Sequence, residues 1–289
     1  MTAKSTAHSR RTTWRKAKSD VMMGVAVLAT VITLLPLFII LTYLVLKGAS
    51  SLNLAFFTHM PAPVGEKGGG MANAIVGTLE LIGLASLMGV PVGIGSGLYL
   101  AAHHGSRFAS AARFGADVMM GVPSIVVGIF AYAVVVRPMG GFSTLAGAVA
   151  LAVIMIPLVT RTTEEMLLLV PHELREAALA LGVPGWRTTL WVVARTAASG
   201  IATGAILAIA RIAGETAPLL FTAFGNRFWA TSLTSPIASL TVQVYTYAIS
   251  PFPDWQRQAW AGALVLTTIV LALELGVRWM TRGSARVAR

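Results

Sequence analysis

The sequence contains no cysteine, which excludes disulfide scaffolds, thiolate zinc sites, iron–sulfur clusters and cysteine nucleophiles. Charged residues are scarce: they make up 11% of the chain, against about 25% in an average globular protein. Acidic residues are the scarcest, with 11 Asp plus Glu against 22 Lys plus Arg in 289 residues. No Gly-Lys-Ser or Gly-Lys-Thr is present either, so the chain lacks a phosphate-cradling loop and is not itself an ATPase.

Long apolar runs are what the sequence has in abundance, and 56% of its residues are hydrophobic. About 20 apolar residues in a helix cross a bilayer core of about 30 Å. Six runs of that order are present: Val21–Leu46, Asn73–Ala101, Phe114–Val136, Phe142–Thr160, Ser199–Phe221 and Ala259–Val277. We therefore expect an all-α integral membrane protein, with six transmembrane helices in one domain covering residues 21–280.

The basic residues indicate how this domain is oriented. They are concentrated in two terminal tails, 1–20 and 281–289, and in the segment 161–198 between the fourth and fifth runs. Because loops rich in Lys and Arg stay in the cytoplasm, both termini and segment 161–198 are expected there. This topology accounts for the net charge of +11 without a nucleic acid partner. On the other side, proline, glycine and tryptophan in 48–72 and 222–258 predict irregular segments at the membrane surface.

Segment 161–198 is too long for a simple turn and too charged to lie in lipid. Pro171 suits the first turn of a helix, and Gly182 followed by Pro184 is a helix-stop signal, so we predict a short helix from Pro171 to Leu181. One face of it would carry Leu174, Ala177, Ala178 and Leu181. Its many alanines and balanced charge favour docking into a groove of another protein over lying on the membrane surface, and both interpretations remain open.

Charged residues also occur within the apolar runs. Arg211 and Glu215 are four residues apart in the fifth run, a spacing that permits an ion pair on one helix face. A lone charge at a helix centre costs about 2.5–3.5 kcal/mol, so such residues usually face protein or water. Periodicity alone leaves open whether the pair only neutralises itself or serves a function. The adjacent His103 and His104 have no further ligand nearby, and we expect no metal site.

Several motifs resemble one known family. Glu176-Ala177-Ala178 followed by Gly182 resembles the EAA loop of ATP-binding-cassette importer permeases, although the second half of that motif is degenerate here. The segments 121–126, 161–164, 210–221 and 250–260 resemble the phosphate-importer permeases of the PstA type. The resemblance covers about residues 20–280 and implies the six-helix type I (MetI-like) permease fold.

The resemblance also implies a function: a non-enzymatic permease subunit of an ATP-driven phosphate importer in the bacterial inner membrane. Arg211 and Arg161 would lie on the phosphate path, since guanidinium groups suit oxyanions, with Glu215 moderating the attraction. Glu176, Ala177, Ala178 and Gly182 would couple the chain to the ATPase.

The implied partners are a homologous second permease subunit (PstC-type), two copies of an ATPase subunit (PstB-type), an extracytoplasmic phosphate-binding protein (PstS-type) and membrane lipid. No cofactor is expected in this chain, because ATP and Mg would bind the ATPase subunits. The alternative is a permease for another oxyanion, molybdate or sulfate.

Overall fold

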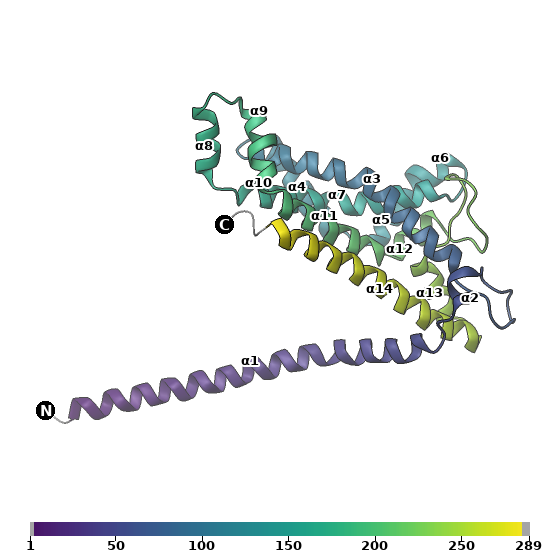
Figure 1. The fold of residues 1–289 in the computed structure, drawn as a ribbon, viewed down its shortest axis with the longest axis horizontal. Coiled ribbons are helices and arrows are strands. Elements are labelled where there is room, and N and C mark those ends of the chain that lie inside the picture. Colours follow the sequence, from purple (N-terminus) through teal and green to yellow (C-terminus); the bar gives the residue numbers. More distant parts are fainter. Residues whose placement is uncertain (1–2, 285–289) are drawn as a thin grey trace.

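A computed structural model describes residues 3–284, and it is helical with no strand in that range. Most helices lie side by side in one bundle, while helix α1 (Ala3–Ala49) projects away from it (Figure 1). The last residues of α1 reach the bundle at helix α14 (Pro253–Ser284), where the ring of Tyr43 meets that of Trp260 edge-on at 5.0 Å. Of the two expected basic tails, residues 1–2 and 285–289 lie outside the described residues.

Four helices of the described chain are long and apolar enough to cross a membrane: α1, α3 (Ala72–Ala102), α7 (Thr144–Leu168) and α14. Two further pairs of helical segments, each joined by a sharp bend, reach that length and apolarity only together. Counting each bent pair as one span gives six, as the apolar runs predict.

The third span is not the continuous helix expected over Phe114–Val136. Helix α4 (Arg107–Gly121) ends there and α5 (Ser124–Ala131) continues at 104° to it, followed by the π-helix η1 (Tyr132–Val136) and by α6 (Arg137–Met139). The cause is Pro123, which has no N–H and disfavours helical geometry at the residue before it. Val122 accordingly has extended backbone angles, with ψ at 129°.

The fifth span also differs from the expected helix over Ser199–Phe221. Helix α11 (Ala198–Ala213) ends before Gly214, and a short α12 (Ala217–Thr222) follows, with a proline in its first turn. Before α11, the segment made of α9 (Gly185–Arg187), η2 (Thr188–Val193) and α10 (Ala194–Thr196) lies at 71° to it. Glu215 is therefore outside α11, and the prediction that it shares a helix face with Arg211 is wrong.

The predicted irregular segment 222–258 is more ordered and more buried than expected. It contains helix α13 (Leu240–Ala248), which begins where the Ser239 hydroxyl accepts a hydrogen bond from the Val242 N–H. The buried Leu240 N–H donates to Thr78 on α3 at 2.7 Å. This end of the bundle, which we call the α2 end, also holds α2 (Leu54–Thr58) and is opposite the end where α8 (His172–Ala180) lies, the α8 end (Figure 1).

Three glycines bring α3 and α7 together at the centre of the bundle. A Cβ added to Gly89, Gly93 or Gly97 would lie less than 3 Å from a side chain of α7, namely Met155, Val159 and Thr163 in turn. The matching order shows that α3 and α7 run in the same direction. Small residues at every fourth position let two helix backbones approach closely in a membrane protein.

Candidate functional site

Five charged side chains meet between α4 and α7, near the α8 end: Arg113, Asp117, Arg161, Glu164 and Glu165. Glu164 is fully buried and binds both arginines. Its Oε1 accepts a hydrogen bond from Arg113 Nε at 2.9 Å, and its Oε2 accepts one from Arg161 Nη1 at 2.6 Å. We call this set the α4–α7 ion cluster.

Within this cluster, Arg161 faces a carboxylate at each of its guanidinium nitrogens. Its Nε lies 2.9 Å from Asp117 Oδ1, and its Nη2 lies 3.6 Å from Glu165 Oε1. Three acids against two arginines give the cluster a formal charge of −1. As arranged here, Arg161 fastens α4 to α7: each of its guanidinium nitrogens faces a carboxylate, and Nη1 makes the hydrogen bond to Glu164.

Arg211 is in the opposite situation. It is exposed in the last turn of α11, while the other face of that helix, with Ala208 and Ile212, is buried in the core. No ion pair within the described part of the chain includes Arg211 or Glu215, so the pairing that their spacing permits is not formed. Glu215 is half-buried, and its backbone carbonyl accepts a hydrogen bond from Thr241. Arg211 thus presents an unneutralised guanidinium outside the bundle.

The two arginines that the family resemblance assigns to one path lie at different depths. Gly204 of α11 packs against Thr162 of α7, and Gly200 packs against Met166, so the two helices are antiparallel there. Arg211 lies about two helical turns beyond Gly204, which places it about 10 Å farther from the α8 end than Arg161. The structure does not bring Arg161 and Arg211 together.

The short helix predicted from Pro171 to Leu181 is present as α8, with these two residues as its N- and C-terminal caps. Gly182 follows with a φ of +79°, in the left-handed region that glycine adopts readily. Figure 1 shows α8 at the extremity of the bundle.

The predicted apolar face of α8 is only partly covered. Ala178 is buried, whereas Leu174 is 42% and Leu181 84% exposed. Glu176 is exposed too and lies 3.6 Å from His172. The helix therefore carries apolar side chains that this chain does not bury itself.

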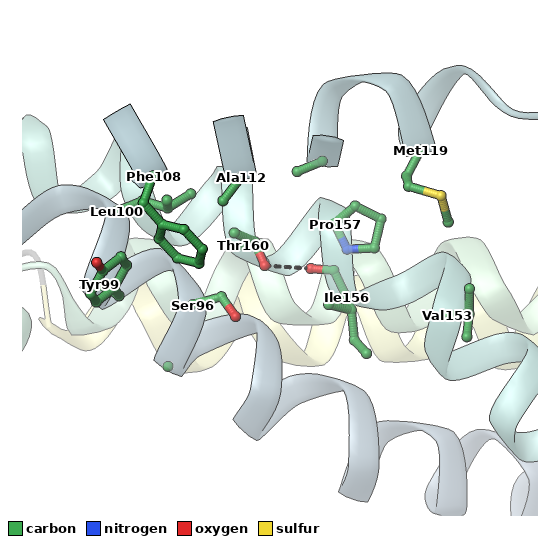
Figure 2. Close-up of a pocket in the computed structure, with 12 residues that line it drawn as sticks. Ser96, Tyr99, Leu100, Phe108, Ala112, Met119, Val153, Ile156, Pro157 and Thr160 are labelled. Atoms are coloured by element: carbon green, nitrogen blue, oxygen red, sulfur yellow. Dashed lines mark hydrogen bonds between the residues drawn. The ribbon is translucent and has the colours of Figure 1, made fainter. Parts of the chain in front are cut away.

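A cavity of about 620 Å³ lies between α3, α4 and α7 (Figure 2), and Thr160 in its wall directly precedes Arg161 of the ion cluster. Its walls are apolar apart from Ser96, Tyr99 and Thr160, and the Thr160 hydroxyl donates a hydrogen bond to the Ile156 carbonyl at 2.8 Å. Sequence reasoning missed this cavity, because it arises where α4 turns away at Pro123.

Sequence reasoning also missed the roles of Arg113 and Glu164. The available signal was spacing: Arg113 and Asp117 are four residues apart, and Arg161 and Glu164 are three apart, so each pair shares one helix face. The spacing of residues within each helix could not show that α4 packs against α7.

Comparison with known proteins identifies relatives over nearly the whole chain. Residues 89–286 match the family model described as binding-protein-dependent transport system inner membrane component. The phosphate transport system permease protein PstA of Yersinia pestis is 47% identical over 270 residues, which is 93% of this chain and 92% of that protein. PstA of Haemophilus influenzae is 46% identical over 92% of this chain and 94% of that protein.

The fold has solved counterparts as well. A chain of a bacterial alginate ABC transporter, crystallised with its alginate-bound periplasmic protein, superposes with a TM-score of 0.66 at 15% identity. The match covers 93% of this chain and 96% of the other.

Proposed function

This chain belongs to the PstA family of phosphate transport system permeases, within the binding-protein-dependent inner membrane components, and from that premise we propose how its residues carry phosphate. It is a membrane-spanning permease subunit of an ATP-binding-cassette importer, and its substrate is inorganic phosphate. One set of its side chains forms the phosphate path, and another set couples transport to ATP hydrolysis.

The observation that carries the path is the exposed, unneutralised Arg211 on the otherwise apolar α11. A guanidinium offers a planar fork of donors that fits a phosphate and cannot lose its charge. A charge in an apolar span is costly unless it faces protein or water, so this face of α11 lines a hydrated path. The homologous second permease (PstC-type) completes that path from the other side.

Arg161 acts later on the same path, at the ion cluster near the α8 end. Its three carboxylate neighbours lower its affinity for phosphate, so the ion does not bind too tightly to move on. Phosphate contacts Arg161 only when α4 and α7 shift and a carboxylate withdraws. Glu215, directly after α11, lowers the positive potential around Arg211 without pairing with it.

Helix α8 couples this path to ATP hydrolysis. Its exposed Leu174 and Leu181, together with Glu176, Ala177 and Gly182, dock into a groove of an ATPase subunit (PstB-type), two copies of which bind ATP and Mg. The chain itself catalyses no reaction. The α8 end and both termini face the cytoplasm, and a phosphate-binding protein (PstS-type) meets the α2 end outside the inner membrane.

Reconstitution of the four kinds of subunit in liposomes tests this function. Radiolabelled phosphate should enter when ATP is present on the α8 side, and excess sulfate or molybdate should not compete. Arg211→Gln should reduce uptake at least tenfold with the complex still assembled, and Arg137→Gln, which removes another exposed arginine, should not. Normal uptake by Arg211→Gln would refute the path, and uptake of molybdate or sulfate in place of phosphate would refute the substrate.

A further inference from the structure

We propose that two adjoining cavities at the α8 end form a binding site for one phospholipid with an anionic headgroup. The first, the acyl cavity, is the apolar cavity of about 620 Å³ between α3, α4 and α7. The second, the headgroup cavity, has a volume of about 480 Å³ and lies between the end of α3 and the segment from α8 to η2. Both volumes are in the range of small-molecule sites in proteins, about 300–1,000 Å³.

Tyr99 of α3 lines both cavities and stands between them. Its ring stacks on His103 at 4.4 Å, and it meets Phe108 edge-on at 5.8 Å. Figure 2 shows Tyr99 and Phe108 close together at one side of the acyl cavity, with Met119 and Val153 toward the other. In the proposed site, one elongated molecule lies along this ring and occupies both cavities.

The two cavities differ in polarity in the way a phospholipid does. The acyl cavity is walled mainly by aliphatic and aromatic groups, among them Leu100, Phe108 and Met119. The headgroup cavity also has apolar walls, with Leu98, Leu179 and Trp186 among them, but it adds Arg175 and His103. No acidic residue lines either cavity.

Arg175 supplies a positive charge to the wall of the headgroup cavity. It is half-buried on α8, and no ion pair within residues 3–284 includes it. A cation that is half-buried, without a carboxylate and facing a cavity is suited to an anion. Lys and Arg at a membrane surface attract anionic lipids in this way.

The order of the two cavities along α3 fits the bilayer. Going from Gly95 to His103, α3 runs toward the α8 end, so the apolar cavity lies deeper in the membrane and the cationic one lies at its surface. Tyr99 and Trp186 both line the headgroup cavity, and Tyr and Trp are the residues enriched at membrane–water interfaces. The lipid belongs to the leaflet at the α8 end, and only its designation as the cytoplasmic leaflet rests on the proposed function. A bound headgroup holds α8 against α3.

Titration of the full-length chain in detergent with lipid, followed by native mass spectrometry, tests the proposal. Phosphatidylglycerol should bind more tightly than phosphatidylcholine with the same acyl chains. Arg175→Gln should weaken phosphatidylglycerol binding about fivefold, the effect of one basic residue, and should leave phosphatidylcholine binding unchanged. Arg195→Gln, which removes an exposed arginine of α10 that lines neither cavity, is the matched control and should bind as wild type does.

Filling the acyl cavity gives an independent readout. A Cβ at Gly95 meets no atom within 4 Å, so Gly95→Leu should fold and weaken the binding of both lipids. If Gly95→Leu does not give a helical, monodisperse protein, Ala112→Leu fills the same cavity.

Three results would overturn the site: equal binding of the two lipids, unchanged phosphatidylglycerol binding in Arg175→Gln, or unchanged binding in the cavity-filling variant. Displacement of the lipid by inorganic phosphate, but not by chloride at equal ionic strength, would assign the headgroup cavity to free phosphate and would also overturn the lipid site.

Discussion

The Oε2 atom of Glu164 lies 2.6 Å from Nη1 of Arg161, one turn earlier on the same helix, and this contact commits Arg161 to its own chain. The other oxygen of the same buried carboxylate binds Arg113 on α4. Arg161, which the family resemblance assigns to the phosphate path, thus also links α4 to α7. If Arg161 lies on the phosphate path as proposed, phosphate must compete with carboxylates for it, which favours release of the ion over retention.

The first prediction concerns this buried carboxylate. Glu164→Gln should destabilise the protein by about 2–4 kcal/mol, because it leaves Arg113 and Arg161 without their shared partner in a mostly buried place. Glu165→Gln is the matched control: Glu165 is exposed and lies 3.6 Å from Arg161, so its loss should cost less than about 1 kcal/mol. Thermal unfolding in detergent measures both. Equal unfolding temperatures for the two variants would contradict the role of Glu164.

A second prediction uses the separation of Arg211 from Glu215. If Glu215 only neutralised Arg211, the double change Arg211→Gln with Glu215→Gln would restore the uptake that Arg211→Gln loses. Because no ion pair joins them and α11 ends between them, we expect the double variant to remain inactive. Phosphate uptake at matched expression decides the matter, and recovery in the double variant would show that Arg211 serves only charge balance.

A third prediction concerns the packing of α3 on α7. Gly93→Leu should destabilise the bundle by about 1–3 kcal/mol or more, because even a Cβ there would lie 2.6 Å from Val159. Gly95→Ala, two residues on and in open space, should unfold at the wild-type temperature. Size-exclusion chromatography after a heat step compares them, and similar losses in both would mean that glycine is needed there for another reason.

A fourth prediction addresses coupling. Gly182→Ala forces a side chain into a left-handed backbone conformation, which costs about 1–2 kcal/mol and should displace the end of α8. The assembled complex should then hydrolyse ATP with reduced phosphate transport per ATP. Gly185→Ala, without a positive φ and with open space around it, should leave that ratio unchanged. An unchanged ratio in Gly182→Ala would argue against docking through this end of α8.

The fifth prediction tests orientation and uses the absence of native cysteine. Cysteine replacing Lys67, exposed at the α2 end, should react with a membrane-impermeant maleimide added outside cells. Cysteine replacing Leu181, which is 84% exposed beside α8, should react only after the membrane is opened. Labelling of both positions from the same side would contradict an even number of spans between the N-terminus and α8.

The sequence by itself determined the class of this protein, its six apolar spans and the short helix ended by Gly182. These depend on local quantities: the length of an apolar run compared with the bilayer, and the backbone preferences of proline and glycine at a helix end. The backbone preferences of proline also predict a helix break at Pro123. The long apolar run Phe114–Val136 instead led us to expect one continuous helix.

Tertiary structure alone decided which charges meet. Arg211 and Glu215, close in sequence, do not pair, because the chain leaves the helical path after Ala213. Arg113 and Glu164, 51 positions apart, share a hydrogen bond because α4 packs on α7. The cavities beside Tyr99 have the same origin, since the space between helices depends on their crossing and bending, to which several distant segments contribute at once.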